Sequence, residues 1–340
     1  MAETSWNDIV GQKQLVDNLR GALKFHKISH AYLIQGERLS GKKMIADIFA
    51  RALQCETQGS EVQGKILPCN QCRSCKQAMN RNHPDIIYVS HEKPNVISVD
   101  NIRQQINGDI AIKPYSGERK IYIVDEAEKM NVQAQNALLK TLEEPPEYAV
   151  ILLLATRAET MLQTILSRCV VLNTRPVHEQ PIKNFLMQKI KVPDYRAAIC
   201  ASFARGNVGR AMELASNEVF DNMKNSVIGV MKKIPEMQIN QIAAEIKKIT
   251  EEKFDVEDYL DLCFIWYRDV LLYKACGIHG DKKHIIFKED MTDIADAAKR
   301  YSYEGLERII HSIDRARSRL KANVNFDLTM ELMLLDMKAG

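Results

Sequence analysis

The stretch AYLIQGERLSGKKMIA, residues 31–46, decides the fold. It begins with a short apolar run that is typical of a buried β-strand, and from Lys42 onward it has a helical pattern. The residues between, GERLSGKK, match the phosphate-binding loop G-x-x-x-x-G-K-[ST] except at the last position, where Lys43 replaces serine or threonine. Because the motif needs a strand before it and a helix after it, this context favours a phosphate loop with one defect.

The loop residues have separate chemical roles. Gly36 and Gly41 allow the backbone to approach a phosphate closely and to turn tightly, while backbone N–H groups and the start of the helix attract the anion. Lys42 would add a point charge. Lys43 stands where a hydroxyl should coordinate Mg²⁺, so it removes one ligand and repels the ion. We therefore expect this loop to hold Mg²⁺ poorly and to hydrolyse ATP inefficiently. Whether it still binds a nucleotide stays open.

A pair of carboxylates forms the second nucleotide element. Asp125 and Glu126 follow the apolar run IYIV, at the carboxyl end of a predicted strand. In nucleoside triphosphatases of this design the aspartate helps to hold Mg²⁺, and a positioned glutamate can polarise the attacking water. An acidic turn after a buried strand is the alternative, and the phosphate loop upstream favours the nucleotide interpretation.

Short apolar runs alternate with helical patterns through the first half of the chain. They lie at residues 31–35, 85–89, 120–125, 150–156 and 169–172. This alternation predicts an α/β domain over residues 1–174, with a parallel sheet that is covered on both faces. Beyond it the strand signals stop, and the pattern predicts only helices, a short set over residues 175–218 and a longer set over residues 219–340.

Eight cysteines are present, and four of them form a set. C-x₂-C spacing and four thiolates are what a tetrahedral structural Zn²⁺ site requires; the set is Cys55, Cys69, Cys72 and Cys75. We expect a zinc module over about residues 55–80. Reduced thiols without a metal are the alternative, and His83 is a less favoured substitute ligand. The other four cysteines are scattered singly.

Composition places limits on partners and location. Charged residues make up 27% of the 340 residues and the net charge is only +3, so any contact with nucleic acid must come from a local patch. Two sets of basic residues are candidates, with solvated faces or ion pairs as the alternative: Lys113, Arg119 and Lys120, and then Arg315, Arg317, Arg319 and Lys321. No run of eighteen apolar residues occurs and the N-terminus is acidic and polar, so we expect a cytoplasmic protein without a membrane partner.

Several motifs resemble those of one family. The cysteine module follows the phosphate-loop helix and is itself followed by HPDI, an arrangement that resembles the clamp-loader family of bacterial replication, AAA+ proteins of the DNA polymerase III holoenzyme. Other stretches that resemble this family span roughly residues 5–215: HAYLIQG, DEAEKMNVQAQNALLKTLEEPP, LLLAT, ILSRC and ARGNVGRAMEL. Lys43, the motif DEAEKM and the C-terminal ANVNFDLTMELMLL resemble the delta-prime branch more than the ATP-hydrolysing gamma/tau branch.

The resemblance implies roles for three further residues. Arg168 in ILSRC would be an arginine finger that acts on a nucleotide held by a neighbouring subunit, with a surface ion pair as the alternative. Thr156 and Arg210 match the sensor positions of the nucleotide site. The resemblance also implies an AAA+ core, a small helical lid and a helical collar that joins subunits, over the three ranges given above.

The implied function is that of a delta-prime-like subunit. Such a subunit would help to load a sliding clamp onto primed duplex DNA, in a hetero-oligomer with delta and gamma/tau subunits. It would donate Arg168, hydrolyse no ATP itself and have no polymerase activity. The alternative is an ATP-hydrolysing gamma/tau-like subunit or a helicase-like AAA+ motor that tolerates Lys43, so whether the chain is itself an enzyme stays open.

Overall fold

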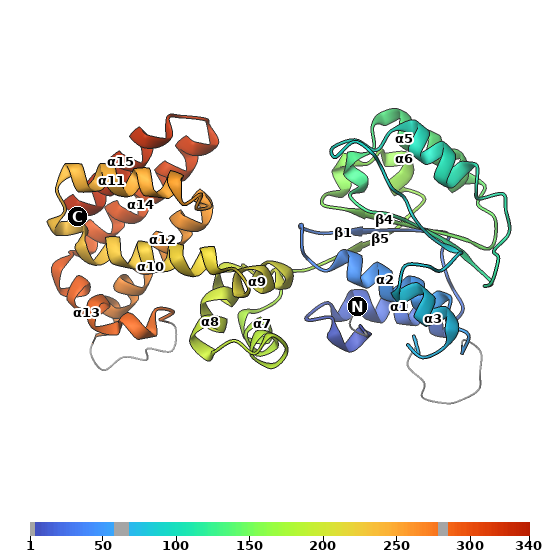
Figure 1. Cartoon of the computed structure of the whole chain (residues 1–340), viewed down its shortest axis with the longest axis horizontal. Coiled ribbons are helices and arrows are strands. Elements are labelled where there is room, and N and C mark those ends of the chain that lie inside the picture. Colours follow the sequence, from blue (N-terminus) through green and yellow to red (C-terminus); the bar gives the residue numbers. More distant parts are fainter. Residues whose placement is uncertain (1–3, 58–67, 278–284) are drawn as a thin grey trace. The chain divides into compact units, whose positions relative to one another are not determined.

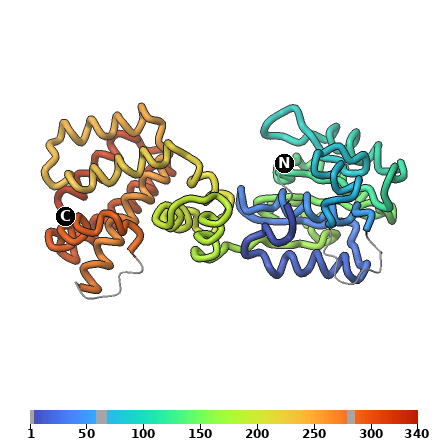
Figure 2. The backbone as a smooth tube through the Cα atoms, turned by 60° about the horizontal axis from the view of Figure 1, so that its bottom comes forward, coloured from blue at the N-terminus to red at the C-terminus, as the bar shows by residue number. Residues whose placement is uncertain are grey.

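The computed structural model of the chain describes residues 4–57, 68–277 and 285–340. These residues form two compact units. The first unit contains the chain up to Pro181 together with Gly206–Arg210, and the second contains Ile182–Arg205 and Ala211–Gly340. In Figure 2 most of the first unit is coloured from blue to green and most of the second from yellow to red. The predicted zinc module includes residues 58–67, which lie outside the described residues.

The first unit is built on a five-stranded sheet, as predicted (Figure 1). All of its strand pairs are parallel, and the spatial order is β2-β3-β4-β1-β5. The strands are β1 (Ala31–Gln35), β2 (Ile86–Tyr88), β3 (Lys120–Val124), β4 (Ala149–Ala155) and β5 (Val170–Asn173). Every residue of β3 and β4 is buried, because central parallel strands are covered on both faces.

Helices cover the two faces of this sheet (Figure 1). Alternate side chains of the strands point to opposite faces, so Ile34 and Leu152 pack in one cluster with α1 (Lys13–Lys24) and α2 (Lys42–Leu53). Leu33 and Leu153 pack in the other cluster with α4, α5 and α6. The bounds of those helices are Val99–Ile102, Val132–Glu143 and Gln163–Leu166. The predicted α/β sandwich is therefore confirmed.

Shorter elements complete the first unit. The short helix α3 (Arg73–Met79) lies within the cysteine-rich segment, where Cys72 is its N-terminal cap. The remaining elements are single turns or one π-helical stretch: η1 (Trp6–Asp8), η2 (Arg103–Asn107), η3 (Ala127–Lys129) and η4 (Ala158–Thr160).

The second unit contains helices and no β-strand among its described residues. Its core surrounds the long helix α12, on which Trp266, Tyr259 and Tyr267 are fully buried. The elements from residue 179 onward are α7 (Glu179–Phe185), η5 (Leu186–Ile190), α8 (Asp194–Phe203), α9 (Val208–Ala215), α10 (Glu218–Lys233), η6 (Ile234–Glu236), α11 (Ile239–Glu251), α12 (Val256–Cys276), η8 (Lys288–Asp290), α13 (Met291–Arg300), α14 (Tyr303–Lys321) and α15 (Phe326–Ala339).

Buried charge links three segments of this second unit. The carboxylate of Asp261, on α12, accepts hydrogen bonds from Arg205 and from Arg317 of α14. Arg317 also pairs with Glu257 at 3.3 Å. A buried carboxylate needs such partners, since an unpaired charge in the interior is costly.

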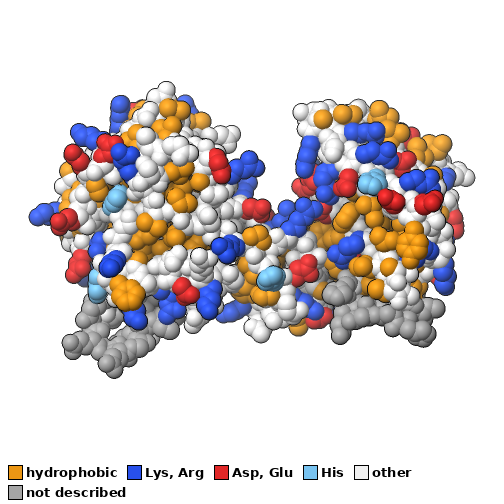
Figure 3. Space-filling model, turned by 180° about the vertical axis from the view of Figure 1, so that it is seen from behind, with side chains coloured by type: hydrophobic (Ala, Val, Ile, Leu, Met, Phe, Trp, Pro, Cys, Tyr) orange, Lys and Arg blue, Asp and Glu red, His pale blue; other side chains and the backbone are white. Residues whose placement is uncertain are grey.

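The surface carries charges of both signs. On the face shown in Figure 3, basic and acidic side chains are interspersed over both units, in keeping with the net charge of only +3. Among the described helices, none combines the length and the apolar character that a membrane-spanning segment requires.

Candidate functional site

The phosphate loop connects β1 to α2 and leaves no room for larger residues at its first position. A Cβ atom on Gly36 would lie 1.7 Å from Thr174 Oγ1. Gly41 caps α2 with a positive φ of 87°, a conformation that glycine adopts at low cost. The loop therefore has the tight path that the motif predicts.

Lys42 points back onto its own loop. Its ammonium donates hydrogen bonds to the carbonyl oxygens of Gly36 and Glu37. Burial lowers the pKa of Lys42, while the carboxylates of Glu128 and Asp125 oppose that shift. The charge that would meet a phosphate is thus satisfied by backbone carbonyls of the loop.

Lys43 does more than remove a metal ligand. Its Nζ lies 2.8 Å from Oδ2 of Asp125, a residue 82 positions further along the chain. Both side chains are partly exposed, 48% for Lys43 and 39% for Asp125. The ammonium therefore neutralises the carboxylate that the sequence predicts as a Mg²⁺ ligand.

Glu126 also has a cationic partner inside the chain. Lys129 Nζ donates to Glu126 Oε2, and Glu126 adopts a left-handed backbone conformation with φ of 51°. Such a conformation is uncommon for a residue other than glycine. Both carboxylates of the acidic pair are therefore engaged by lysines.

The two sensor candidates lie on segments that contact this site. The backbone N–H of Thr156 donates to Glu128 Oε2 at 3.2 Å, and Glu128 is the carboxylate with the largest effect on Lys42. Arg210 belongs to the segment Gly206–Arg210, in which Asn207 donates from Nδ2 to the carbonyl of Arg38 at 2.6 Å. Glu128 and Asn207 lie within the quoted motifs DEAEKM and ARGNVGRAMEL, but the sequence alone assigned neither of them a role.

Arg168 and the phosphate loop lie at opposite ends of the neighbouring strands β5 and β1. In the β1–β5 register Val170 is opposite Tyr32, so Arg168 is level with the start of β1, whereas Gly36 follows its end. Six residues of extended strand span about 20 Å, which is farther than an arginine side chain reaches. The structure therefore does not bring Arg168 together with the chain's own nucleotide element.

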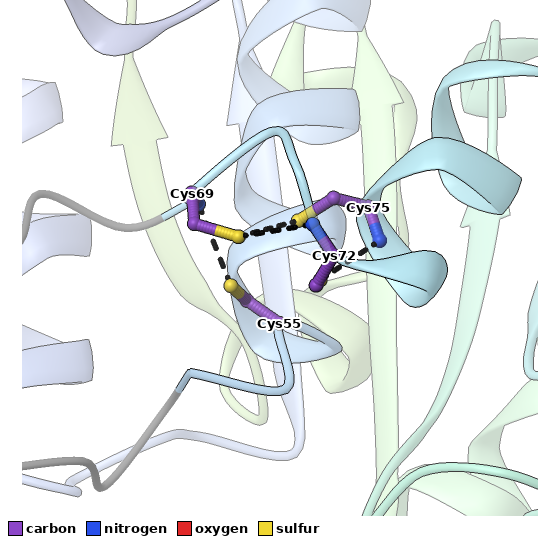
Figure 4. A group of neighbouring side chains, drawn as sticks. All are labelled: Cys55, Cys69, Cys72 and Cys75. Carbon is purple, nitrogen blue, oxygen red and sulfur yellow. Dashed lines mark hydrogen bonds between the residues drawn. The ribbon is translucent and has the colours of Figure 1, made fainter.

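Four sulfur atoms converge at the end of α2 (Figure 4). The Sγ atoms of the set predicted from the sequence all lie within 4.8 Å of one another, and those of Cys69 and Cys75 are 3.9 Å apart. Tetrahedral coordination with a Zn–S distance of 2.3 Å implies sulfur separations of about 3.8 Å. The four cysteines are therefore positioned to bind a metal ion.

Hydrogen bonds around the cluster favour thiolates. Backbone N–H groups of Cys69, Cys72 and Cys75 donate to the sulfurs of Cys55, Cys69 and Cys72, respectively. A hydrogen bond from Cys75 lowers the pKa of Cys55 to about 4, against the effect of burial. Burial raises the pKa of Cys72, and hydrogen bonding to Cys55 raises that of Cys75, so the hydrogen bonds favour the thiolate at only part of the set.

His83 is a structural residue and not a ligand. Its Nε2 lies 2.9 Å from Ser74 Oγ, and its Nδ1 accepts a hydrogen bond from the backbone of Asp85. Burial lowers the pKa of His83, which favours the neutral ring. The ring therefore connects the cysteine-rich segment, through Ser74, to the backbone at Asp85.

Several candidate nucleic-acid contacts are engaged elsewhere. Lys120 is only 4% exposed and donates to the carbonyls of Asp109 and Ile112, so it offers no charge to an outside phosphate. Arg317 is committed to Asp261 and Glu257. Arg315 pairs with Asp336 at 3.0 Å on the surface.

The sequence is similar to subunits of DNA polymerase III. The family model described as DNA polymerase III, delta subunit, matches residues 11–178. The chain is 28% identical to DNA polymerase III subunit delta' of Bacillus subtilis, over 99% of this chain and 99% of that protein. It is also 28% identical to subunit tau of the same organism, over 93% of this chain and 58% of that protein.

A solved structure, a gamma subunit-related DNA polymerase III protein from Thermotoga maritima, aligns with 95% of this chain and 99% of its own at 22% identity, with a TM-score of 0.42. The matched segment 11–178 contains the sheet, the phosphate loop and the cysteine cluster. Together with the full-length delta' relative, it shows that the chain belongs to the clamp-loader family of DNA polymerase III subunits.

Proposed function

We propose that the chain is a delta-prime-like subunit that completes the ATPase site of a neighbouring subunit and hydrolyses no ATP itself. The observation that carries this proposal is the ion pair between Lys43 and Asp125, at 2.8 Å. It occupies the place where an ATPase of this family would assemble its magnesium site. Within a clamp loader, such a subunit would help to place the sliding clamp on primed duplex DNA.

The electrostatics of the pocket support an idle site. Two unit charges 4 Å apart interact by about 1 kcal/mol even in bulk water, so an ammonium at that distance opposes a divalent ion by about 2 kcal/mol. The same ammonium occupies Asp125, so Mg²⁺ would also have to displace it. Neither cost exists when a hydroxyl stands at this position.

The position of Arg168 supports action on another molecule. Because it lies at the other end of the strands from the loop that starts at Gly36, it would meet a nucleotide held by a different chain and not one held in its own loop. An arginine finger that stabilises charge on the transferring phosphoryl group increases turnover by about 10³–10⁵-fold. Arg168 is 34% exposed in this chain, so it is open to a partner.

We assign Zn²⁺ to the cysteine cluster. Four sulfurs that all lie within 4.8 Å of one another could fill a four-coordinate shell, which is typical of a structural site and would leave no position for a substrate. The ion would join the end of α2 to α3.

We assign the helical region from residue 175 onward to contacts with other subunits of the complex. In this proposal residues 175–218 form a lid and residues 219–340 a collar that contacts delta and gamma/tau subunits. An exposed apolar pair supports the collar: Leu328 and Leu332, four residues apart on α15, are 52% and 41% exposed. Residues at this spacing share one face of a helix.

Reconstitution with delta and gamma/tau subunits tests the proposal. The purified chain alone should hydrolyse no ATP, and Arg168→Ala should leave assembly intact while lowering the turnover of the complex by about 10³-fold. Unaltered turnover in an assembled Arg168→Ala complex would exclude the finger. Rapid hydrolysis by the isolated chain that is lost in Lys42→Ala would favour the gamma/tau-like alternative.

A further inference from the structure

Arg168 already has partners within its own chain. Nη1 donates to the carbonyl of Thr164 at 2.9 Å and to Ser167 Oγ at 3.3 Å. Nη2 lies 2.9 Å from Oε1 of Glu143. One side of the guanidinium is thus held by its own turn, and the other side by a carboxylate from a different helix.

Glu143 is well placed to be that partner. It is the last residue of α5, whose register is fixed by buried Leu138 and Leu142. Glu144, Pro145 and Pro146 follow, and proline restricts both its own backbone and that of the residue before it. The carboxylate therefore projects from a rigid helix end toward the turn that carries Arg168.

The pair is weak enough to open. The two side chains are 34% and 51% exposed, and ion pairs at such positions are screened by water and salt. A phosphate carries more negative charge than a carboxylate and binds a guanidinium through two parallel hydrogen bonds. Glu143 and a phosphate would repel each other at the same guanidinium, so one must leave.

From these contacts we infer that Glu143 is the resting counter-ion of the finger. It holds the guanidinium of Arg168 while no nucleotide is opposite, and the terminal phosphate of ATP bound by the neighbouring subunit displaces it. This inference rests on the proposed function, since it concerns the same finger. Glu143 is a regulating residue, and it touches neither the nucleotide nor the reacting atoms.

The test is steady-state ATP hydrolysis by the reconstituted complex of this chain with delta and gamma/tau. Glu143→Gln should lower KM for ATP by up to about fivefold, because an exposed pair contributes at most about 1 kcal/mol. The kcat should stay unchanged, since the pair is already open once ATP has engaged the finger. The gain should shrink as the salt concentration rises from about 0.05 M to about 0.5 M.

Matched variants separate this role from a structural one. Glu144→Gln removes the same charge one residue away and should leave KM unchanged, and Glu143→Asp, with a shorter reach, should give an intermediate KM. In an Arg168→Ala background Glu143→Gln should have no effect. An unchanged KM, or a fall in kcat, in an assembled Glu143→Gln complex would overturn the counter-ion role while leaving the finger intact. An Arg168→Ala complex with normal turnover would instead defeat the proposed function itself.

Discussion

The cysteine cluster and the phosphate loop of the first unit differ in how their negative charge is balanced. At the cluster, four sulfurs and three backbone donors gather negative charge without any cationic side chain in the set. At the loop, the chain supplies its own cations, since Lys43 pairs with Asp125 and Lys129 pairs with Glu126. The cysteine cluster therefore needs a bound metal ion to balance its charge, whereas at the phosphate loop the carboxylates are already balanced by lysines.

This difference shows that a phosphate-binding motif can keep its backbone path while its charged groups are paired within the chain. The loop path, the glycine at position 36 and the strand that delivers Asp125 are all present, yet their charges are satisfied internally. The cysteine cluster has no internal substitute for its ion. Removing the ion should therefore damage the cluster, whereas the loop should be indifferent to Mg²⁺.

The largest expected effect is at the cluster. Cys72→Ser should reduce bound zinc from one ion per chain to none and lower the free energy of unfolding of the first unit by several kcal/mol, because structural zinc binds with an apparent free energy of about 10–16 kcal/mol in small domains. Metal analysis and thermal unfolding would measure both. Cys276→Ser changes an exposed thiol of the second unit and should alter neither; a metal-free protein of equal stability would contradict the site.

Acid should release the ion without any mutation. Cys55 has a lowered pKa, about 4, because Cys75 donates a hydrogen bond to it, so its thiolate persists through the neutral range. Stability from a group with a lowered pKa is lost as the pH falls through that value, and protons compete with the metal for each thiolate. Zinc release, followed with a coloured chelator, should therefore rise as the pH falls below neutral, because protons compete with the metal for all four thiolates. Release that increases toward alkaline pH would reverse this sign.

A smaller effect is expected at the loop. Lys43→Thr should strengthen Mg²⁺-nucleotide binding by at least about tenfold, since it restores a hydroxyl ligand and removes the repulsion between cations. Calorimetry with a non-hydrolysable ATP analogue, with and without Mg²⁺, would measure the change. Lys43→Arg retains the charge and should give no gain. Equal affinities of the Lys43→Thr and Lys43→Arg variants would contradict the claim that the charge of Lys43 opposes Mg²⁺ at the loop.

The smallest effect concerns the stability of the loop pair. A double-mutant cycle on Lys43 and Asp125 should give a coupling of at most about 1 kcal/mol in the free energy of unfolding, and it should decrease with salt. The pair of Lys120 with Asp109 is a useful reference, because the Lys120 side chain is only 6% exposed. Its coupling should be the larger of the two, and the reverse order would argue against solvent screening at the loop.

The sheet was predictable because buried parallel strands are nearly continuous apolar runs. The runs at 31–35 and 120–125 correspond to β1 and β3 within one residue. The run at 85–89 also agrees with β2 within one residue at each end, and its terminal residues still bond to β3, because Ile121 N donates to the carbonyl of Asp85 and Val89 N donates to that of Ile123.

The site was predictable only in its parts. C-x₂-C spacing identifies the metal ligands because neighbouring thiolates must chelate one ion. The motif at Lys43 indicated a lost ligand, but its pairing with Asp125 depends on how β1 and β3 lie in the folded sheet. Likewise, nothing local to Arg168 indicates Glu143 as its partner, because that contact exists only once α5 and the turn after α6 are packed.

Arg168, the proposed finger, and the phosphate loop lie at opposite ends of the strands of one sheet, and this placement has a consequence for assembly. A contact that brings the finger of one chain to the loop of the next joins unlike surfaces, and such heterologous contacts generate rings or helical filaments. A subunit whose own loop is internally neutralised can supply an arginine finger to the nucleotide of the next subunit. It has no working nucleotide site of its own on which another subunit's finger could act. It would therefore mark one end of the series of working sites, so that an assembly containing it has fewer sites than subunits.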